Sequence, residues 1–182
     1  HEGVMSTVCR KTQAGMWLSS FVQYRDEAAF EALFREYYPR ITRLLVTLVG
    51  DQAEDVAQAA FLQLYRHPPR ESGEVGAWLY RVATHLGYNA LRDRRRRWQR
   101  DVHLVPSESD DAEAEAAQRE ERRAVRAALA RLNERQAQLL ILRQMEFSYA
   151  ECAEICGCPV GTIRSRVARA RADLVIAYRL RD

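Results

Sequence analysis

Apolar residues recur along most of this chain every three or four positions, which is the spacing of one face of an α-helix. Asp26 can cap the first such segment, whose apolar positions are Phe30, Leu33, Phe34, Tyr37, Ile41, Leu44, Leu45 and Leu48. Pro39 is expected either to kink this segment or to divide it. Apolar and polar residues alternate little, so β-strands have weak support. The pattern predicts an all-α protein.

Two further helices complete a first bundle of three or four helices that ends near Arg100. Gly50 and Asp51 are expected to stop one helix and cap the next, whose apolar stripe is Val56, Ala57, Ala60, Phe61 and Leu64. His67 and the two prolines after it end that helix, and residues 70–76 form a polar loop. A long helix then runs into an arginine block, with apolar positions at Trp78, Leu79, Val82, Ala83, Leu86 and Ala90.

A second helical region is predicted after an acidic linker. Residues 102–117 contain Pro106, few bulky side chains and many acids, which favours a flexible segment. The helical pattern resumes at Glu120, and Asn133 with Gln136 has the spacing of a capping box. Residues 139–142 are expected to be largely buried. The predicted units are residues 1–24 as an N-terminal extension or tag remnant (with Met5 or Met16 as the native start), 25–100, the linker 101–119, and 120–182.

Residues 148–174 hold a short helix, a glycine turn and a second helix. Ser148 and Glu151 form a capping box, Gly157 allows a tight turn, and Pro159 marks the start of the last helix. The expected inward stripe is Val160, Ile163, Val167, Ala170 and Leu174, which leaves Thr162, Arg164, Ser165, Arg166, Arg169 and Arg171 outside. This pattern is typical of a DNA-binding helix-turn-helix. The alternative is a helical hairpin with a solvated basic face.

Charge is distributed in blocks although the net charge is only +3. Residues 92–100 hold six arginines and one aspartate, residues 107–121 hold seven acids and one arginine, and residues 159–182 hold six arginines and two aspartates. Lysine occurs once, so nearly all positive charge is arginine, which suits bidentate contacts with phosphates and bases. The blocks favour two nucleic-acid surfaces on either side of a linker, with ordinary charged helix faces as the alternative.

No catalytic, metal or cofactor site is predicted. Three of the four cysteines are Cys152, Cys156 and Cys158, and Cys9, far away in sequence, would be needed to complete a tetrahedral zinc site. Cys152 and Cys156 are instead expected on the inward helix face as small apolar residues. The sequence contains no phosphate-binding glycine loop, nucleophile elbow or zinc motif. It also lacks a long apolar run and a secretory signal, so the protein is expected in the cytoplasm with reduced thiols.

Residues 149–174, YAECAEICGCPVGTIRSRVARARADL, closely resemble the promoter-binding region of extracytoplasmic-function (ECF) sigma factors. Four other stretches resemble the same family in the same order: FEALFREYYPRI, DQAEDVAQAAFLQLYR, GAWLYRVATHLGYNALRDRRRR and LARLNERQAQLLILR. The resemblance covers about residues 30–174. It implies an all-α fold of two small helical domains joined by a flexible acidic linker, the C-terminal one a helix-turn-helix. It also implies sigma region 2 in residues 25–100 and sigma region 4 in residues 120–182.

The resemblance implies three binding surfaces. The first surface is expected to bind the minus-thirty-five element, and its residues are Thr162, Arg164, Ser165, Arg166, Ala168, Arg169 and Arg171. Arginine can bind guanine bidentately, Thr162 and Ser165 can hold phosphates, and the Ala168 methyl can contact thymine.

A second surface is expected to bind the minus-ten element, because aromatic and cationic side chains together hold unpaired strands. Its residues are Tyr80, Arg81, His85, Tyr88, Asn89, Arg92 and Arg95. His85 stands where many relatives have asparagine, and Trp78 is expected to pack in the core. A third surface, formed by Glu54, Asp55 and Gln58, is acidic and is expected to bind the β′ subunit of polymerase.

The implied partners are core RNA polymerase, through its β′ and β subunits, promoter DNA and a membrane-anchored anti-sigma factor, with no small-molecule substrate. Through the anti-sigma factor the cytoplasmic protein would be held at the inner membrane. That inhibitor is expected between the two domains, covering the surface around Glu54 and Asp55 and an apolar surface near residues 139–142. The alternative to inhibition by a partner is control through synthesis of the protein alone.

Two other hypotheses for the function remain. The protein could be a repressor whose first bundle dimerises or senses a ligand, or a nucleic-acid enzyme with a helix-turn-helix appendage.

Overall fold

In the computed structural model, residues 2–69, 75–100 and 113–180 are described, and they contain helices and no strand. The elements are α1 (Glu2–Tyr24), α2 (Glu27–Val49), the 3₁₀ turn η1 (Gly50–Gln52), α3 (Ala53–Arg66), α4 (Val75–Arg100), α5 (Glu113–Leu129), α6 (Glu134–Gln144), α7 (Tyr149–Cys156) and α8 (Val160–Arg179). The all-α prediction is confirmed.

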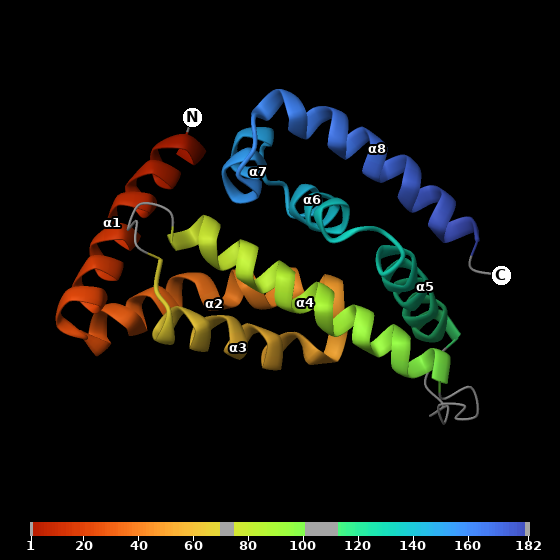
Figure 1. Cartoon of the computed structure of the whole chain (residues 1–182), viewed down its shortest axis with the longest axis horizontal. Coiled ribbons are helices and arrows are strands. Elements are labelled where there is room, and N and C mark those ends of the chain that lie inside the picture. The colour runs from red at the N-terminus through yellow and green to blue at the C-terminus, as the bar shows by residue number, and fades with distance from the viewer. Residues whose placement is uncertain (1, 70–74, 101–112, 181–182) are drawn as a thin grey trace.

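The first half of the chain is a bundle of α1, α2, α3 and α4 (Figure 1). Asp26 caps α2, because its Oδ1 accepts hydrogen bonds from the backbone N–H groups of Ala28 (3.0 Å) and Ala29 (3.3 Å). Leu33, Ile41 and the leucines that follow at helical spacing are fully buried, as their spacing predicted. Pro39 lies inside α2 without dividing it.

Three details of this bundle differ from the sequence prediction. Gly50 does end α2, but Asp51 does not cap α3: the N-cap residue is Gln52, without a side-chain cap, because η1 intervenes. Helix α4 already begins at Val75, inside the predicted loop, whose residues 70–74 lie outside the described residues. Helix α1 was not predicted at all, and its Ala14, Leu18 and Phe21 are buried.

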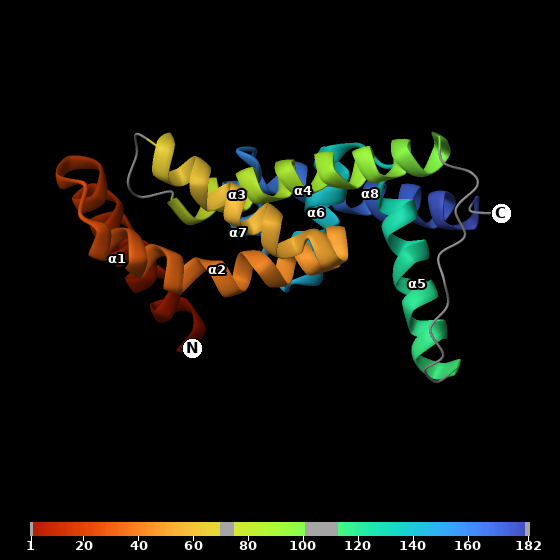
Figure 2. The ribbon, with the colours of Figure 1, turned by 90° about the horizontal axis from the view of Figure 1, so that it is seen from below.

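The second half contains α5, α6, α7 and α8, and α8 contacts the other three. The predicted capping box of α6 is confirmed, with Asn133 Oδ1 accepting from Gln136 N–H at 2.9 Å. Helix α5 begins at Glu113, seven residues before the predicted start at Glu120, and residues 101–112 of the predicted linker lie outside the described residues. Figure 2 shows α5 extending away from the rest of the molecule.

The two halves contact each other directly. Helix α4 packs on α2 and α3 with one side and on α6 and α7 with another (Figure 1), while α2 also contacts α5 and α6. Residues 139–142 are largely buried, as predicted. The expectation that an apolar surface near these residues is available to an inhibitor is therefore wrong for this arrangement, since Leu139, Ile141 and Leu142 belong to the core.

Candidate nucleic-acid interface

Helices α7 and α8 form the predicted helix-turn-helix. At the start of α7, Ser148 Oγ accepts from Glu151 N–H (3.2 Å) and Glu151 Oε2 accepts from Ser148 N–H (2.8 Å). Gly157 ends the helix in the left-handed conformation, with φ 62° and ψ 43°, which a residue with a Cβ adopts at a cost. Cys158 N–H then donates to Ala153 C=O at 3.1 Å, which closes the turn.

The inward face of α8 holds the helix against α6 and α7. Ile163, Val167 and Ala170 are buried and Leu174 is half-buried, as predicted. Val160 is 41 % exposed, so its assignment to this face is wrong. It is the first residue of the helix and follows the exposed turn at Gly157 and Pro159.

The residues assigned to the minus-thirty-five element share the outer face of α8. Thr162 and Arg166 are half-buried, and the others are exposed: Arg164, Ser165, Ala168, Arg169 and Arg171. The Ser165 hydroxyl donates to Thr162 C=O at 3.0 Å. The face combines four guanidinium groups with short side chains on one α-helix, the kind of element that the major groove accepts.

One contact of this face was not predicted. The Tyr149 ring, at the start of α7, lies near two guanidinium groups, with the Arg143 carbon at 4.6 Å and the Arg164 carbon at 5.7 Å from the ring centroid. Arg143 also donates to Phe147 C=O, which holds it beside the ring. Tyr149 therefore limits the positions that Arg164 can take. No sequence spacing marks this contact, because it depends on how α6, α7 and α8 pack together.

The residues assigned to the minus-ten element are less accessible. Tyr80 and Tyr88 are each only 5 % exposed, Arg81 and Asn89 are half-buried, and His85 and Arg92 are exposed. Burial raises the pKa of Tyr80 to about 12. The Arg95 side chain lies outside the described residues. Trp78 is half-buried against the core, which fits its expected packing role.

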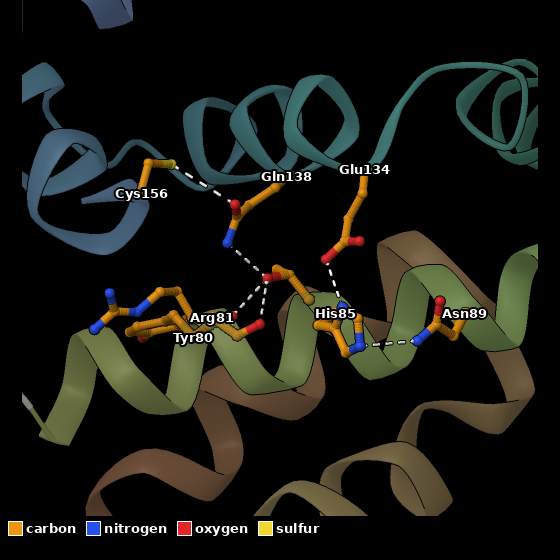
Figure 3. Close-up of polar contacts among 8 residues, drawn as sticks. Tyr80, Arg81, His85, Asn89, Glu134, Gln138 and Cys156 are labelled. Carbon is orange, nitrogen blue, oxygen red and sulfur yellow. Dashed lines mark hydrogen bonds and ion pairs between the residues drawn. The ribbon is translucent and has the colours of Figure 1, made fainter. Parts of the chain in front are cut away.

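This face of α4 is covered by the second half of the chain (Figure 3). His85 Nδ1 lies 2.7 Å from Glu134 Oε1, and Asn89 Nδ2 lies 3.0 Å from His85 Nε2. Gln138 Nε2 donates to Thr84 Oγ1 at 2.8 Å. No function was predicted from the sequence for Glu134 or Gln138.

The residues assigned to polymerase lie together on the first two turns of α3. Glu54, Asp55 and Gln58 are exposed, whereas Ala53, Val56 and Ala57 of the same turns are buried against the bundle. The two carboxylates also interact favourably with the positive end of the helix dipole. The structure thus presents them on one solvent-facing surface.

The cysteines of α7 pack inside the second half. Cys152 is buried, and its thiol lies 3.9 Å from Phe147 O; the half-buried Cys156 thiol lies 3.7 Å from Gln138 Oε1. Burial is the main reason that the pKa of each of these two thiols rises to about 11. Within residues 2–69, 75–100 and 113–180, no group of three or more His, Cys, Asp or Glu side chains is placed to hold a metal ion.

No helix in the described part of the chain is both long enough and apolar enough to span a membrane. The fold and the α8 surface define a helical DNA-binding protein with a helix-turn-helix in its C-terminal half. Residues 33–97 match the family model for Sigma-70 region 2, and residues 122–174 match the model for Sigma-70, region 4.

Relatives match over most of their length. The RNA polymerase sigma-H factor of Pseudomonas aeruginosa is 35% identical over 167 residues, which cover 82% of this chain and 86% of that protein. The ECF RNA polymerase sigma-E factor of Escherichia coli K12 is 33% identical over 166 residues, with 82% and 86% covered. The chain belongs to the ECF sigma factors of RNA polymerase. Its function is that of an alternative sigma factor, which directs polymerase to initiate transcription at particular promoters.

Two solved structures are similar to this one. The sigma factor RpoE from Bartonella quintana, in complex with the anti-sigma factor NepR, has 25% identity and a TM-score of 0.51 over 84% of this chain and 98% of that chain. CnrH, in complex with the cytosolic domain of CnrY, has 17% identity and a TM-score of 0.62 over 93% of this chain and 99% of that chain. The second is a likeness of fold.

Proposed function

We propose that three surfaces of this sigma factor divide the work of initiation. The outer face of α8 binds the minus-thirty-five element, the face of α4 around His85 and Tyr88 binds the minus-ten strand, and the first turns of α3 bind the β′ subunit of core polymerase. The chain is a non-catalytic subunit acting in the cytoplasm, where core polymerase carries out the chemistry.

The observation that carries this proposal is the exposed arginine face of α8. A helix held by a buried stripe at Ile163 and Val167 presents Arg164 and Arg169 to solvent. Arginine is the side chain that most often binds guanine in the major groove, through two parallel hydrogen bonds. The same geometry would let Arg166 and Arg171 contact phosphates, which fix the register of the helix on DNA.

Run-off transcription with purified core enzyme tests the proposal. The full chain should direct initiation from a promoter upstream of its own gene, and R169A should weaken that initiation without loss of core binding. E54A/D55A should lose core binding while keeping its stability. The matched control is E27A, which removes another exposed acid from the first turn of a helix, here α2. No promoter-specific transcript with any of these chains would refute the assignment.

We also propose that an anti-sigma factor binds this chain, as NepR binds the sigma factor RpoE of Bartonella quintana in their solved complex. The acidic surface around Glu54 and Asp55 remains exposed for such a partner. Co-purification from unstressed host cells should recover the chain with its inhibitor, held at the membrane where that inhibitor is membrane-anchored. An active, partner-free pool in those cells would contradict inhibition by occlusion.

A further inference from the structure

Gly161 is the second residue of α8 and is exposed. A glycine in a helix has more backbone freedom to lose on folding than alanine, so it makes the helix less stable. Glycine at such a position usually serves one of three purposes: a special backbone conformation, a close contact inside the protein, or the close approach of a ligand to the backbone.

Four other glycines of the described chain serve the first two purposes. Gly50 and Gly157 have positive φ angles of 65° and 62°, which residues with a side chain adopt at a cost. A Cβ at Gly76 or Gly87 would come within 2.9 Å and 2.7 Å, respectively, of a neighbouring side chain. The fold itself therefore accounts for these four glycines.

Neither purpose applies to Gly161. Its backbone is helical without a positive φ, and a Cβ built on it would meet no other part of the described chain within 4 Å. The two residues before it are also exposed: Pro159, and Val160 at 41 %. The described part of the chain thus leaves this end of α8 uncovered and offers no reason for glycine there.

The position of Gly161 on α8 indicates which ligand would approach it. Gly161 comes one turn before Ser165 and three residues before Arg164, both on the proposed DNA-binding face. In Figure 1, α8 runs along the edge of the molecule with α7 beside its first turns. In helix-turn-helix proteins, the N-terminal residues of the recognition helix contact base edges in the major groove. Gly161 therefore lies where DNA would come close to the backbone of α8.

A side chain at this position would hold the helix away from the bases. Hydrogen bonds weaken steeply as donor and acceptor move out of line or apart. The bidentate contact of an arginine with guanine needs two such bonds at once. A small outward displacement of α8 would therefore weaken the contacts of Arg164 and Arg169 together.

We propose that Gly161 is a positioning residue that sets the depth of α8 in the major groove. Its missing side chain lets the helix backbone come close enough to the minus-thirty-five element for Arg164 and Arg169 to bind base edges. This role rests on the proposed DNA-binding function of α8. It implies that substitutions of Gly161 change fold stability and promoter recognition in opposite directions.

The test uses holoenzyme reconstituted from core polymerase and full-length variants of the chain. G161A and G161L add side chains of increasing size, and both new residues favour a helix more than glycine does. The control A172G makes the reverse change at an exposed position about three turns further along the same side of α8. Competition binding is measured on fragments with each base pair of the minus-thirty-five element changed in turn, and on one fragment with the whole element replaced. Urea unfolding of the free chains measures stability.

G161A should raise the urea midpoint and weaken binding to the preferred element about tenfold, as expected when arginine–guanine contacts are loosened. G161L should weaken this binding further, and both variants should discriminate less between sequences and bind like the wild type to the fragment without the element. A172G should lower the urea midpoint and keep wild-type binding, which separates recognition from stability.

Wild-type binding by G161A and G161L would overturn the proposal, as would an equal loss on every fragment. Failure of the proposed function gives a different result, because the wild-type holoenzyme itself would then show no preference among minus-thirty-five sequences.

Discussion

Replacing Arg164 by alanine tests whether the exposed face of α8 reads a base. The side chain is exposed, so R164A should leave the fold intact. A bidentate arginine–guanine contact contributes about 1–3 kcal/mol of discrimination, which corresponds to about 5- to 150-fold in affinity. R164A should therefore lose about that much binding to the preferred minus-thirty-five sequence and become indifferent to one base pair.

Tyr149 extends this prediction, because its ring lies 5.7 Å from the Arg164 guanidinium carbon. A cation–π contact at an exposed site contributes about 0.5–1 kcal/mol. Y149F keeps the ring and should discriminate like the wild type, whereas Y149L should lose about two- to fivefold at the base pair that Arg164 contacts. Adding Y149L to R164A should cost little more, since the two side chains act through one contact.

The assay is competition binding by reconstituted holoenzyme to promoter fragments in which each base pair of the minus-thirty-five element is changed in turn. R171A is the control, because a phosphate contact should weaken all fragments alike. If R164A also loses affinity equally on every fragment, Arg164 does not read a base. If Y149F behaves like Y149L, the hydroxyl and not the ring positions Arg164.

The backbone and the thiols allow three further tests: two glycine substitutions, one cap substitution and alkylation of two cysteines. G50A should lose about 1–3 kcal/mol of stability, because Gly50 has φ 65° and a Cβ there would lie 3.0 Å from the Arg126 guanidinium. G161A should gain about 0.5–1 kcal/mol, because a Cβ at Gly161 would have nothing within 4 Å. Urea midpoints of the two variants that move in the same direction would contradict this expectation. S148A should cost about 1 kcal/mol by removing the α7 cap, and an unchanged midpoint would show that the cap is unimportant. Burial raises the pKa of Cys152 and Cys156 to about 11. Each thiol should therefore be alkylated slowly in the folded chain at about pH 8, and faster only as the pH approaches the raised pKa. Mass spectrometry can follow the labelling of each residue, and labelling as fast as in the unfolded chain would refute their burial.

The helices with strong local signals could be predicted from the sequence. The caps at Asp26, Asn133 and Ser148 depend on residues within three positions of one another, and each is formed as expected. The glycine turn at Gly157 is equally local. Such features are encoded by neighbouring residues, so a linear pattern suffices to find them.

The contact between the halves could not be predicted in this way. Thr84 and Gln138 are 54 residues apart, His85 and Glu134 are 49 apart, and each pair meets only because α4 lies against α6. Polar residues on a basic helix look alike in a sequence whether they face solvent, DNA or another part of the chain. The assignment of Tyr88 to the minus-ten strand therefore gave no sign that its hydroxyl also bonds Leu132.

Helix α1 was missed because its sequence pattern is weak, although the helix contributes buried side chains to the bundle. Residues 13–24 carry no charge, so no charged face marks a helix there, and the segment precedes the first cap at Asp26. Yet Phe21 is fully buried, with ring centroids 5.0 Å from Phe30 and 5.3 Å from Tyr65. Leu18 and Ala14 bury the same face of α1 against the bundle.

The stability of the first half should therefore depend on α1. F21A should cost about 3–5 kcal/mol, the usual loss when a buried phenylalanine is truncated to alanine. M16A on the same helix should change stability by no more than about 0.5 kcal/mol, because Met16 is 61 % exposed. Urea unfolding of the full chain, followed by circular dichroism, measures both. Equal small effects from the two substitutions would mean that residues 13–24 are a removable extension. A large loss confined to F21A would make α1 an integral part of the first bundle, where it packs on α2 and α4 and where Phe21 contacts Tyr65 of α3.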